Sequence, residues 1–232
     1  KRLYLAGYFR NSGAIVQHTG RHWLGGVACM DYEGDAPPRP FIGNLEPDSA
    51  LYTSVACDSK GQVYVTEYLK NQIEIYDSQG KLLKTVAANR PALIQVSPKT
   101  GELFVFSWLV HSAAADHMKD KPEDLKHSYE GGKGIFPATL SVFSSLPEPK
   151  LTVRYELPAV STSRFPGNYS QTLAGTQFRG AVDFWTEPLT VWVVPDSPDH
   201  FGRTWEECGV VLLQARDGKL VEKRSFGKDT AK

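Results

Sequence analysis

The chain has 232 residues, of which 41% are hydrophobic, and this is enough apolar sequence for a substantial buried core. Its 26 Lys and Arg residues balance 26 Asp and Glu residues, so the net charge gives no reason to expect binding to nucleic acid or anionic lipid. No apolar run approaches the roughly 20 residues that cross a bilayer, and we expect no membrane span.

Apolar residues recur with a period of two along nearly the whole chain, which predicts an all-β fold. The first predicted strands are Leu3 to Phe9, Gly26 to Asp31 and Arg39 to Gly43. We interpret them as the second, third and fourth strands of a four-stranded unit.

A complete unit of four short strands follows between Ser54 and Val86. After the first strand, its further strands are Gln62 to Tyr68, Gln72 to Tyr76 and Lys81 to Val86. Glycine and aspartate mark the turns between them, as expected of an antiparallel meander.

The same unit recurs twice more. Leu93 to Phe106 repeats the first hairpin, and Ala138 to Phe143 and Leu151 to Leu157 complete that unit. The last unit consists of Gly180 to Trp185, Leu189 to Val194, Gly209 to Ala215 and Lys219 to Phe226. Such repetition predicts a β-propeller of four-stranded antiparallel blades, in which each sheet covers its faces against its neighbours. A β-sandwich is the alternative.

We place the blades at approximately 1–46, 51–87, 92–157 and 180–227, with an inserted loop over 109–137 and a crossover loop over 158–179. About three and a half blades are too few to close a ring, since propellers typically have about four to eight. We therefore expect the propeller to be incomplete in this chain, with its remaining blades supplied by further sequence or by another subunit.

One unit also carries a family pattern. It reads Val55-Ala56-Cys57-Asp58-x-x-Gly61-x-Val63-Tyr64-Val65-Thr66-Glu67, followed by Asn71-Gln72-Ile73 and Tyr76-Asp77-x-x-Gly80. This segment resembles an NHL repeat, although Glu67 stands where the family usually has aspartate and Gln72 where it usually has arginine. The resemblance is specific over about one blade and diffuse elsewhere. It implies a propeller scaffold but not a particular function.

The long connections of this fold are predicted to lie at one end of the sheets. They are Arg10 to Gly25, Asn44 to Thr53, Leu109 to Pro137, Ala159 to Arg179 and Pro195 to Cys208. All are second-to-third links or crossovers between blades, which share one end of a meander. Because long loops on a rigid scaffold commonly carry binding sites, we expect the functional face at this end.

Candidate site residues come from these connections, which hold all the histidines: His18, His22, His111, His117, His127 and His200. Histidine is a common metal ligand and titrates near neutrality. The best predicted metal ligands are His111, Asp116 and His117, although polar residues also gather in surface loops for no functional reason. The remaining binding candidates are Trp108, Arg164, Tyr169, Arg179 and Trp205. No catalytic residue is assigned.

Other residues are predicted to be structural. Trp185 and Trp192 fall on predicted strands and are expected in the core, and Cys29 and Cys57 are expected to be small buried thiols. The lack of a C-x-x-C pair argues against a zinc ribbon and covalent haem, but a single metal ion remains an open cofactor.

The sequence is compatible with two functions. The first is a scaffold or binding module, part of a larger protein or complex, that presents its loops to a partner protein or domain. The alternative is the propeller portion of an enzyme, either metal-dependent and lyase-like or redox, with its site near the central channel. Asn168-Tyr169-Ser170 fits a glycosylation sequon, which would matter only in a secreted eukaryotic protein. Separately, we favour a secreted or periplasmic location over a cytoplasmic one.

Overall fold

The computed structural model describes residues 1–6, 24–47, 50–107, 138–157, 179–194 and 210–226. These ranges contain strands and turns and no helix. Accordingly, no helix in them is long and apolar enough to cross a membrane.

The strands form four antiparallel sheets. The first sheet contains β1 (Arg2–Leu5), β2 (Leu24–Asp31) and β3 (Arg39–Pro47). The second contains β4 (Tyr52–Cys57), β5 (Val63–Glu67), β6 (Gln72–Tyr76) and β7 (Leu82–Ala87). The third contains β8 (Pro91–Val96), β9 (Leu103–Ser107), β10 (Thr139–Phe143) and β11 (Leu151–Glu156). The last contains β12 (Arg179–Asp183), β13 (Thr190–Val194), β14 (Val210–Arg216) and β15 (Lys219–Phe226).

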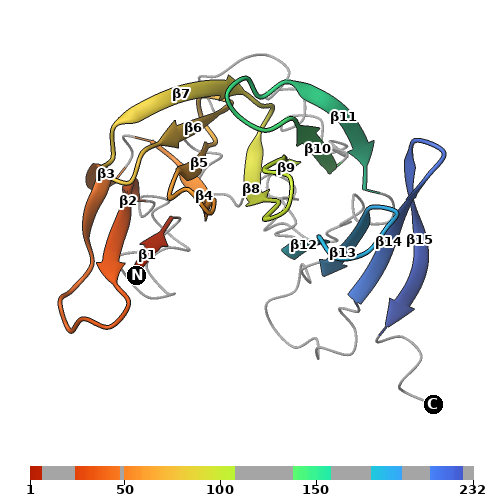
Figure 1. The fold of residues 1–232 in the computed structure, drawn as a ribbon, viewed down its shortest axis with the longest axis horizontal. Coiled ribbons are helices and arrows are strands. Elements are labelled where there is room, and N and C mark those ends of the chain that lie inside the picture. Colours follow the sequence, from red (N-terminus) through yellow and green to blue (C-terminus); the bar gives the residue numbers. More distant parts are fainter. Residues whose placement is uncertain (7–23, 48–49, 108–137, 158–178, 195–209, 227–232) are drawn as a thin grey trace, which may run out of the picture.

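The four sheets follow one another along an open arc (Figure 1). Strands β4, β8 and β12 lie on the inner side of the arc, and β7, β11 and β15 lie on its outer side. Within each of these sheets the chain therefore runs outward strand by strand. This arrangement is a partial β-propeller and confirms the predicted fold class; the sandwich alternative is wrong, because the sheets follow one another around an arc.

The turns of the second sheet form where the sequence predicts them. Asp58 Oδ1 accepts hydrogen bonds of 2.9 Å from the N–H groups two and four residues later, and Gly61 takes the left-handed conformation with φ +79°. Asp77 and Gly80 repeat this geometry, with the same 2.9 Å bonds and φ +83°. An aspartate at the start and a glycine at the positive-φ position thus fix both turns.

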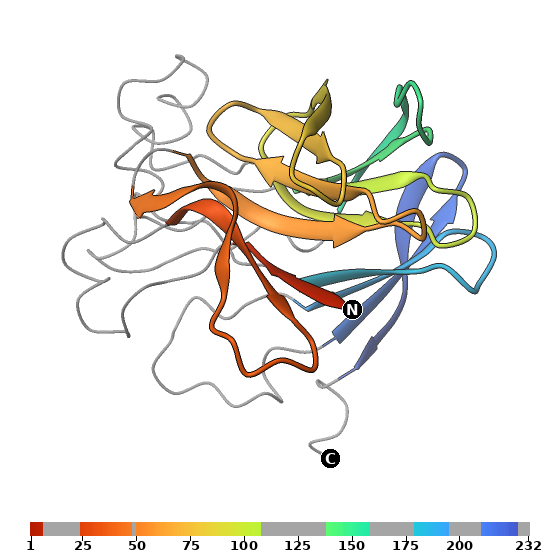
Figure 2. The ribbon, with the colours of Figure 1, turned by 60° about the vertical axis from the view of Figure 1, so that its left-hand side comes forward.

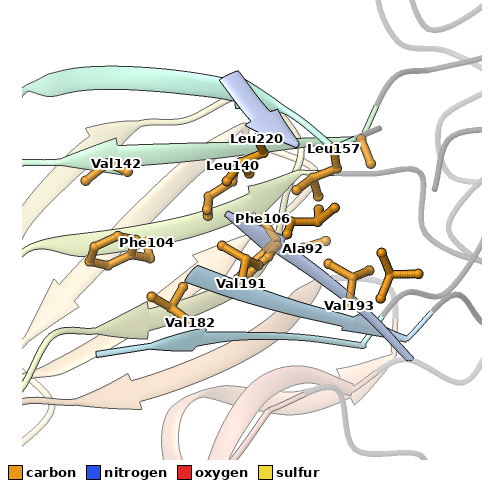
Figure 3. Packing of buried hydrophobic residues seen from close by; sticks show 13 residues of the cluster. Ala92, Phe104, Phe106, Leu140, Val142, Leu157, Val182, Val191, Val193 and Leu220 are labelled. Atoms are coloured by element: carbon orange, nitrogen blue, oxygen red, sulfur yellow. The ribbon is translucent and has the colours of Figure 1, made fainter. Parts of the chain in front are cut away.

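Each pair of neighbouring sheets encloses an apolar cluster. Tyr64, Ile73 and Ile75 of the second sheet pack against residues of the third, among them Leu103 and Val105. The third and last sheets meet in the same way across Phe106, Leu140, Val191 and Val193, all fully buried, as Figure 3 shows. Both faces of the second and third sheets are consequently buried, which accounts for their apolar strands.

Polar side chains join the inner strands of successive sheets. Ser54 Oγ accepts a 3.2 Å hydrogen bond from Ile94 N, and Thr53 Oγ1 donates a 3.0 Å hydrogen bond to the Pro91 carbonyl. Gln95 joins β8 to β12 through two further bonds to backbone groups. Hydroxyl and amide groups therefore connect inner strands that share no backbone ladder.

Three expectations about single residues are wrong. Trp185 lies in the turn after β12 and is 74% exposed, because Asp183 Oδ1 accepts a hydrogen bond from Trp185 N and turns the chain there. Trp192 is on β13, as expected, but is 36% exposed, on a face that none of the described sheets covers. Cys57 is exposed, because β4 ends at this residue, whereas Cys29 is buried as predicted. In addition, β3 extends to Pro47, so the expected long connection from Asn44 to Thr53 is short.

Candidate functional site

The long connections join the sheets at one end of the arc. The undescribed segments 7–23, 108–137, 158–178 and 195–209 follow β1, β9, β11 and β13, respectively. The start of β4 contacts the start of β8 through Thr53 and Pro91, so the inner strands run in the same direction. The short turns after β4, β8 and β12 accordingly point the same way, away from this end (Figure 2). We call the end that carries the long connections the loop-bearing end.

Most of the predicted site residues belong to these connections. His18, His22, Trp108, His111, Asp116, His117, Arg164, Tyr169, His200 and Trp205 lie outside the described residues. Arg179 is the first residue of β12, where its backbone pairs with Val194 at the loop-bearing end.

Glu67 holds the base of the loop-bearing end in the second sheet. It ends β5 and is fully buried. Its carboxylate accepts hydrogen bonds from Leu51 N (2.9 Å), just before β4, and from Lys70 N (2.5 Å), in the link to β6. Burial raises the pKa of the Glu67 carboxyl, and these two N–H donors only partly oppose that rise. One side chain thus fixes two connections.

A second buried carboxylate, Glu74, lies on the same face of the sheet. It is 5% exposed and accepts hydrogen bonds from the hydroxyls of Tyr52 (3.1 Å) and Tyr76 at Oε2. Gln72 Nε2 donates to Oε1 at 2.7 Å, and Lys70 Nζ lies 3.9 Å from the same oxygen. Glu74 is therefore surrounded by hydrogen-bond donors.

The two tyrosines hold their protons firmly. Burial, together with the nearby Glu74 carboxylate, raises the pKa of Tyr52 and of Tyr76 well above the ordinary 10.0. Both hydroxyls consequently remain donors at any physiological pH. Both rings also belong to the apolar cluster that packs the second sheet against Val27 and Ile42 of the first.

This carboxylate cluster is suited to a structural role. Both oxygens of Glu67 and both oxygens of Glu74 accept hydrogen bonds from protein donors. A buried carboxylate that is satisfied in this way fixes the relative position of its donors. The cluster therefore holds the ends of the second sheet and its short connections together.

The part of the chain that the structure describes contains no group of three or more His, Cys, Asp or Glu side chains placed to hold a metal ion. The predicted ligands His111, Asp116 and His117 lie elsewhere, so that prediction stays a prediction.

A further exposed surface lies on the last sheet. Trp192 stacks on Phe226, with ring centroids 5.9 Å apart and an interplanar angle of 28°. The guanidinium of Arg224 lies 4.6 Å from the centre of the same phenylalanine ring. Three side chains of the types that dominate protein interfaces are thus held together on one sheet.

The sequence matches no protein-family model and no curated protein. Among solved structures it is similar to hydrazine synthase of Kuenenia stuttgartiensis, with 10% identity, a TM-score of 0.49, and 87% of this chain and 43% of that chain covered. It is similar to the Cps50 (Swd1) β-propeller domain of Myceliophteria thermophila, with 10% identity and a TM-score of 0.45. The match covers 90% of this chain and 55% of that chain.

A third similar structure is virginiamycin B lyase of Staphylococcus aureus, a catalytically inactive H270A variant with quinupristin. Its identity is 14% and its TM-score 0.43, and the match covers 96% of this chain and 59% of that chain. The chain thus spans about half the length of the solved structures it matches. These structures are β-propeller proteins, and at such low identity nothing about their binding or activity transfers to this chain.

Proposed function

We propose that this chain is an NHL-type β-propeller scaffold within a larger protein or complex, and that its long connections bind a protein partner. The observation that carries the proposal is the position of those connections, which all join the sheets at the loop-bearing end. Long connections that leave rigid sheets at the same end are a common location for binding sites.

Hydrogen bonds hold the short connections of the second sheet at the same end. Glu67 fixes the start of β4 and the link after β5, and Asn71 accepts a 2.9 Å hydrogen bond from Arg90 N in the crossover to β8. Arg90 itself is buried, with φ +43°. These contacts give the second sheet a fixed edge at the loop-bearing end.

The contact residues of this proposal are the binding candidates of the sequence. They are His18, His22, Trp108, His111, His117, Arg164, Tyr169, Arg179, His200 and Trp205. Aromatic and arginine side chains supply much of the affinity in protein interfaces, which favours a protein ligand.

Site-specific photo-cross-linking tests this proposal. A photoreactive phenylalanine analogue replaces Tyr169, in the connection before β12, or Tyr32, an exposed tyrosine in the turn after β2. In the source cells we expect a discrete cross-linked protein from position 169 and none from position 32. Cross-links from position 32 alone, or from neither, would contradict binding at the loop-bearing end.

Metal analysis of the purified chain tests the enzyme alternative, in which the same end holds a metal or cofactor. The binding-module proposal predicts less than stoichiometric zinc, calcium and iron. One equivalent of a metal that is lost in His111→Ala and retained in His127→Ala would instead favour the enzyme.

A further inference from the structure

The turn between β12 and β13 carries Trp185, which at 74% is the most exposed large hydrophobic side chain of the described residues. Its neighbours in the turn are well held. Phe184 packs edge-on against Phe104 of the third sheet, with ring centroids 5.4 Å apart, and Asp183 Oδ1 accepts a 2.9 Å hydrogen bond from Trp185 N. The backbone of the turn is therefore anchored, while the indole ring remains open to solvent.

One cation already lies on this ring. Lys99 Nζ, from the β8–β9 turn of the third sheet, is 4.7 Å from the centre of the Trp185 ring. Ser97 Oγ accepts hydrogen bonds from Lys99 N (3.3 Å) and Thr100 N (3.1 Å) and so holds the backbone that carries this lysine. The turns after β8 and β12, which point away from the loop-bearing end (Figure 2), thus meet in a cation–π contact.

Carboxylates outnumber cations around this contact. The two turns hold one ammonium against three carboxylates, a net charge of −2, from Lys99, Glu102, Asp183 and Glu187. The neighbouring β14–β15 turn pairs Arg216 with Asp217, with Nε 3.7 Å from Oδ2, and adds one cation, Lys219. The other turn of the third sheet is neutral, since Lys150 Nζ lies 3.5 Å from Glu148 Oε2. This end of the two sheets therefore keeps an excess of negative charge, which favours a cationic ligand.

We propose that Trp185 binds an arginine side chain from a basic segment of a partner protein. A guanidinium is planar and weakly hydrated, so it stacks readily on the exposed part of a flat indole ring. Glu187, which is exposed in the same turn, supplies a carboxylate that can pair with the bound cation. Tryptophan, tyrosine and arginine are the residues most enriched among binding hot spots. Because this surface lies at the opposite end of the sheets from the long connections, the proposal is separate from binding at the loop-bearing end.

Fluorine NMR of the full chain tests this proposal. The tryptophans are replaced biosynthetically by fluorotryptophan, and the resonance of Trp185 is identified by its loss in Trp185→Phe. The probe is an acetylated and amidated glycine peptide with a central arginine, and its control contains citrulline, an uncharged side chain of nearly the same shape. We expect a saturable shift of the Trp185 resonance with the arginine peptide, and binding at least about threefold weaker with the citrulline peptide.

Two substitutions of opposite charge give the sign of the ligand. Glu187→Gln removes a carboxylate from the Trp185 turn and should weaken binding of the arginine peptide about two- to threefold. Lys99→Gln removes the competing ammonium and should strengthen that binding about twofold. The controls are Glu33→Gln and Lys60→Gln, which make the same changes in net charge at exposed positions in turns of the first and second sheets and should leave binding unchanged.

Equal binding of the arginine and citrulline peptides, no saturable shift of the Trp185 resonance, or stronger binding in Glu187→Gln would overturn the proposal. So would a shift that the corresponding glutamate peptide causes and that is lost in Lys99→Gln, which would show an acidic ligand. A shift caused only by cellotetraose would show a sugar ligand and would also overturn it. Cross-linking from position 169 does not depend on Trp185, so binding at the loop-bearing end and binding at Trp185 are contradicted by different results.

Discussion

Gln95 and Val182 are 87 residues apart, yet the Gln95 side chain accepts a 2.8 Å hydrogen bond from the Val182 backbone N–H. The same side chain donates to the Gly180 carbonyl, also at 2.8 Å. One primary amide therefore makes both hydrogen bonds that a neighbouring strand would make. It connects the inner strands β8 and β12, which belong to different sheets.

Replacing Gln95 should consequently loosen the contact between the third and last sheets. Gln95→Ala leaves one backbone donor and one backbone acceptor without their side-chain partner, and we expect a loss of about 1–3 kcal/mol in the free energy of unfolding. Gln79→Ala, in an exposed turn, should change it by less than about 0.5 kcal/mol. Urea denaturation of both variants measures the difference, and equal values would contradict a bridging role.

The two tyrosines that donate to Glu74 should behave as a coupled pair. Tyr52→Phe and Tyr76→Phe each remove a donor to a buried carboxylate, at an expected cost of about 1.5–3 kcal/mol. Because both hydroxyls share Oε2, the double variant should differ from the sum of the single variants by at least about 0.5 kcal/mol. If the losses in unfolding free energy were strictly additive in a double-mutant cycle, the two hydroxyls would not share Glu74 Oε2 as their acceptor.

The raised pKa of Glu67 predicts how stability depends on pH. The folded chain binds a proton at Glu67 more tightly than the unfolded chain, in which the ordinary pKa is 4.5. Its contribution to stability is therefore full below pH 4.5 and is lost as the pH rises through the folded-state pKa.

Glu67→Gln should abolish the part of the pH dependence of the unfolding free energy that comes from Glu67. The variant also places an amide nitrogen near Leu51 N or Lys70 N, which adds a pH-independent cost of about 1–3 kcal/mol. The change of stability with pH, rather than stability at one pH, therefore tests the assignment. Glu148→Gln, at an exposed carboxylate, is the control and should keep the pH dependence of the unmodified chain. Thermal unfolding from pH 4 to pH 7 measures both, and an unchanged slope in Glu67→Gln would refute the assignment.

Gly180 of the last sheet lies close to Phe106 of the third. A Cβ atom on this residue would lie 2.7 Å from the ring of Phe106, which is fully buried and has little room to move. We expect Gly180→Ala to cost about 1–3 kcal/mol through overpacking. Combining it with Phe106→Leu should reduce the added cost of the alanine, as measured in the same denaturation experiment. If Gly180→Ala lowered the free energy of unfolding equally with Phe106 and with Leu at position 106, the Phe106 ring would not be the source of the clash.

The sequence predicted the fold because local signals agreed with the global pattern. Asp58 with Gly61 and Asp77 with Gly80 define turns by their own chemistry, and the apolar period of two defines the strands between them. The pattern did not distinguish a covered sheet face from an open one. Trp192 therefore looked like a core residue, since its exposure depends on which sheet follows, and that is a property of the assembly.

Two other features needed the three-dimensional arrangement. Glu74 alternates with Ile73 and Ile75 and so resembles a solvent-facing residue of a one-sided sheet. In a propeller both faces are buried, and its partners Tyr52 and Tyr76 come from two strands. The exposure of Trp185 does have a signal in the sequence, because Asp183 before it and Pro188 after it are turn residues.

The histidine, arginine and tryptophan candidates in the long connections remain predictions. Loops of this length have no repeating apolar pattern that fixes their conformation, so the sequence identifies the end of the sheets at which they lie but not which of their side chains converge.

Hydroxyl-radical footprinting of the unmodified chain, relative to the unfolded chain, tests the central claim most directly. An open arc of stacked sheets predicts strong oxidation of Trp185 and Trp192, and protection of Tyr64 and Phe106, which lie between sheets. If Tyr64 and Phe106 were oxidised as readily as in the unfolded chain, or if Trp192 were as protected as Phe106, the open arc would be contradicted.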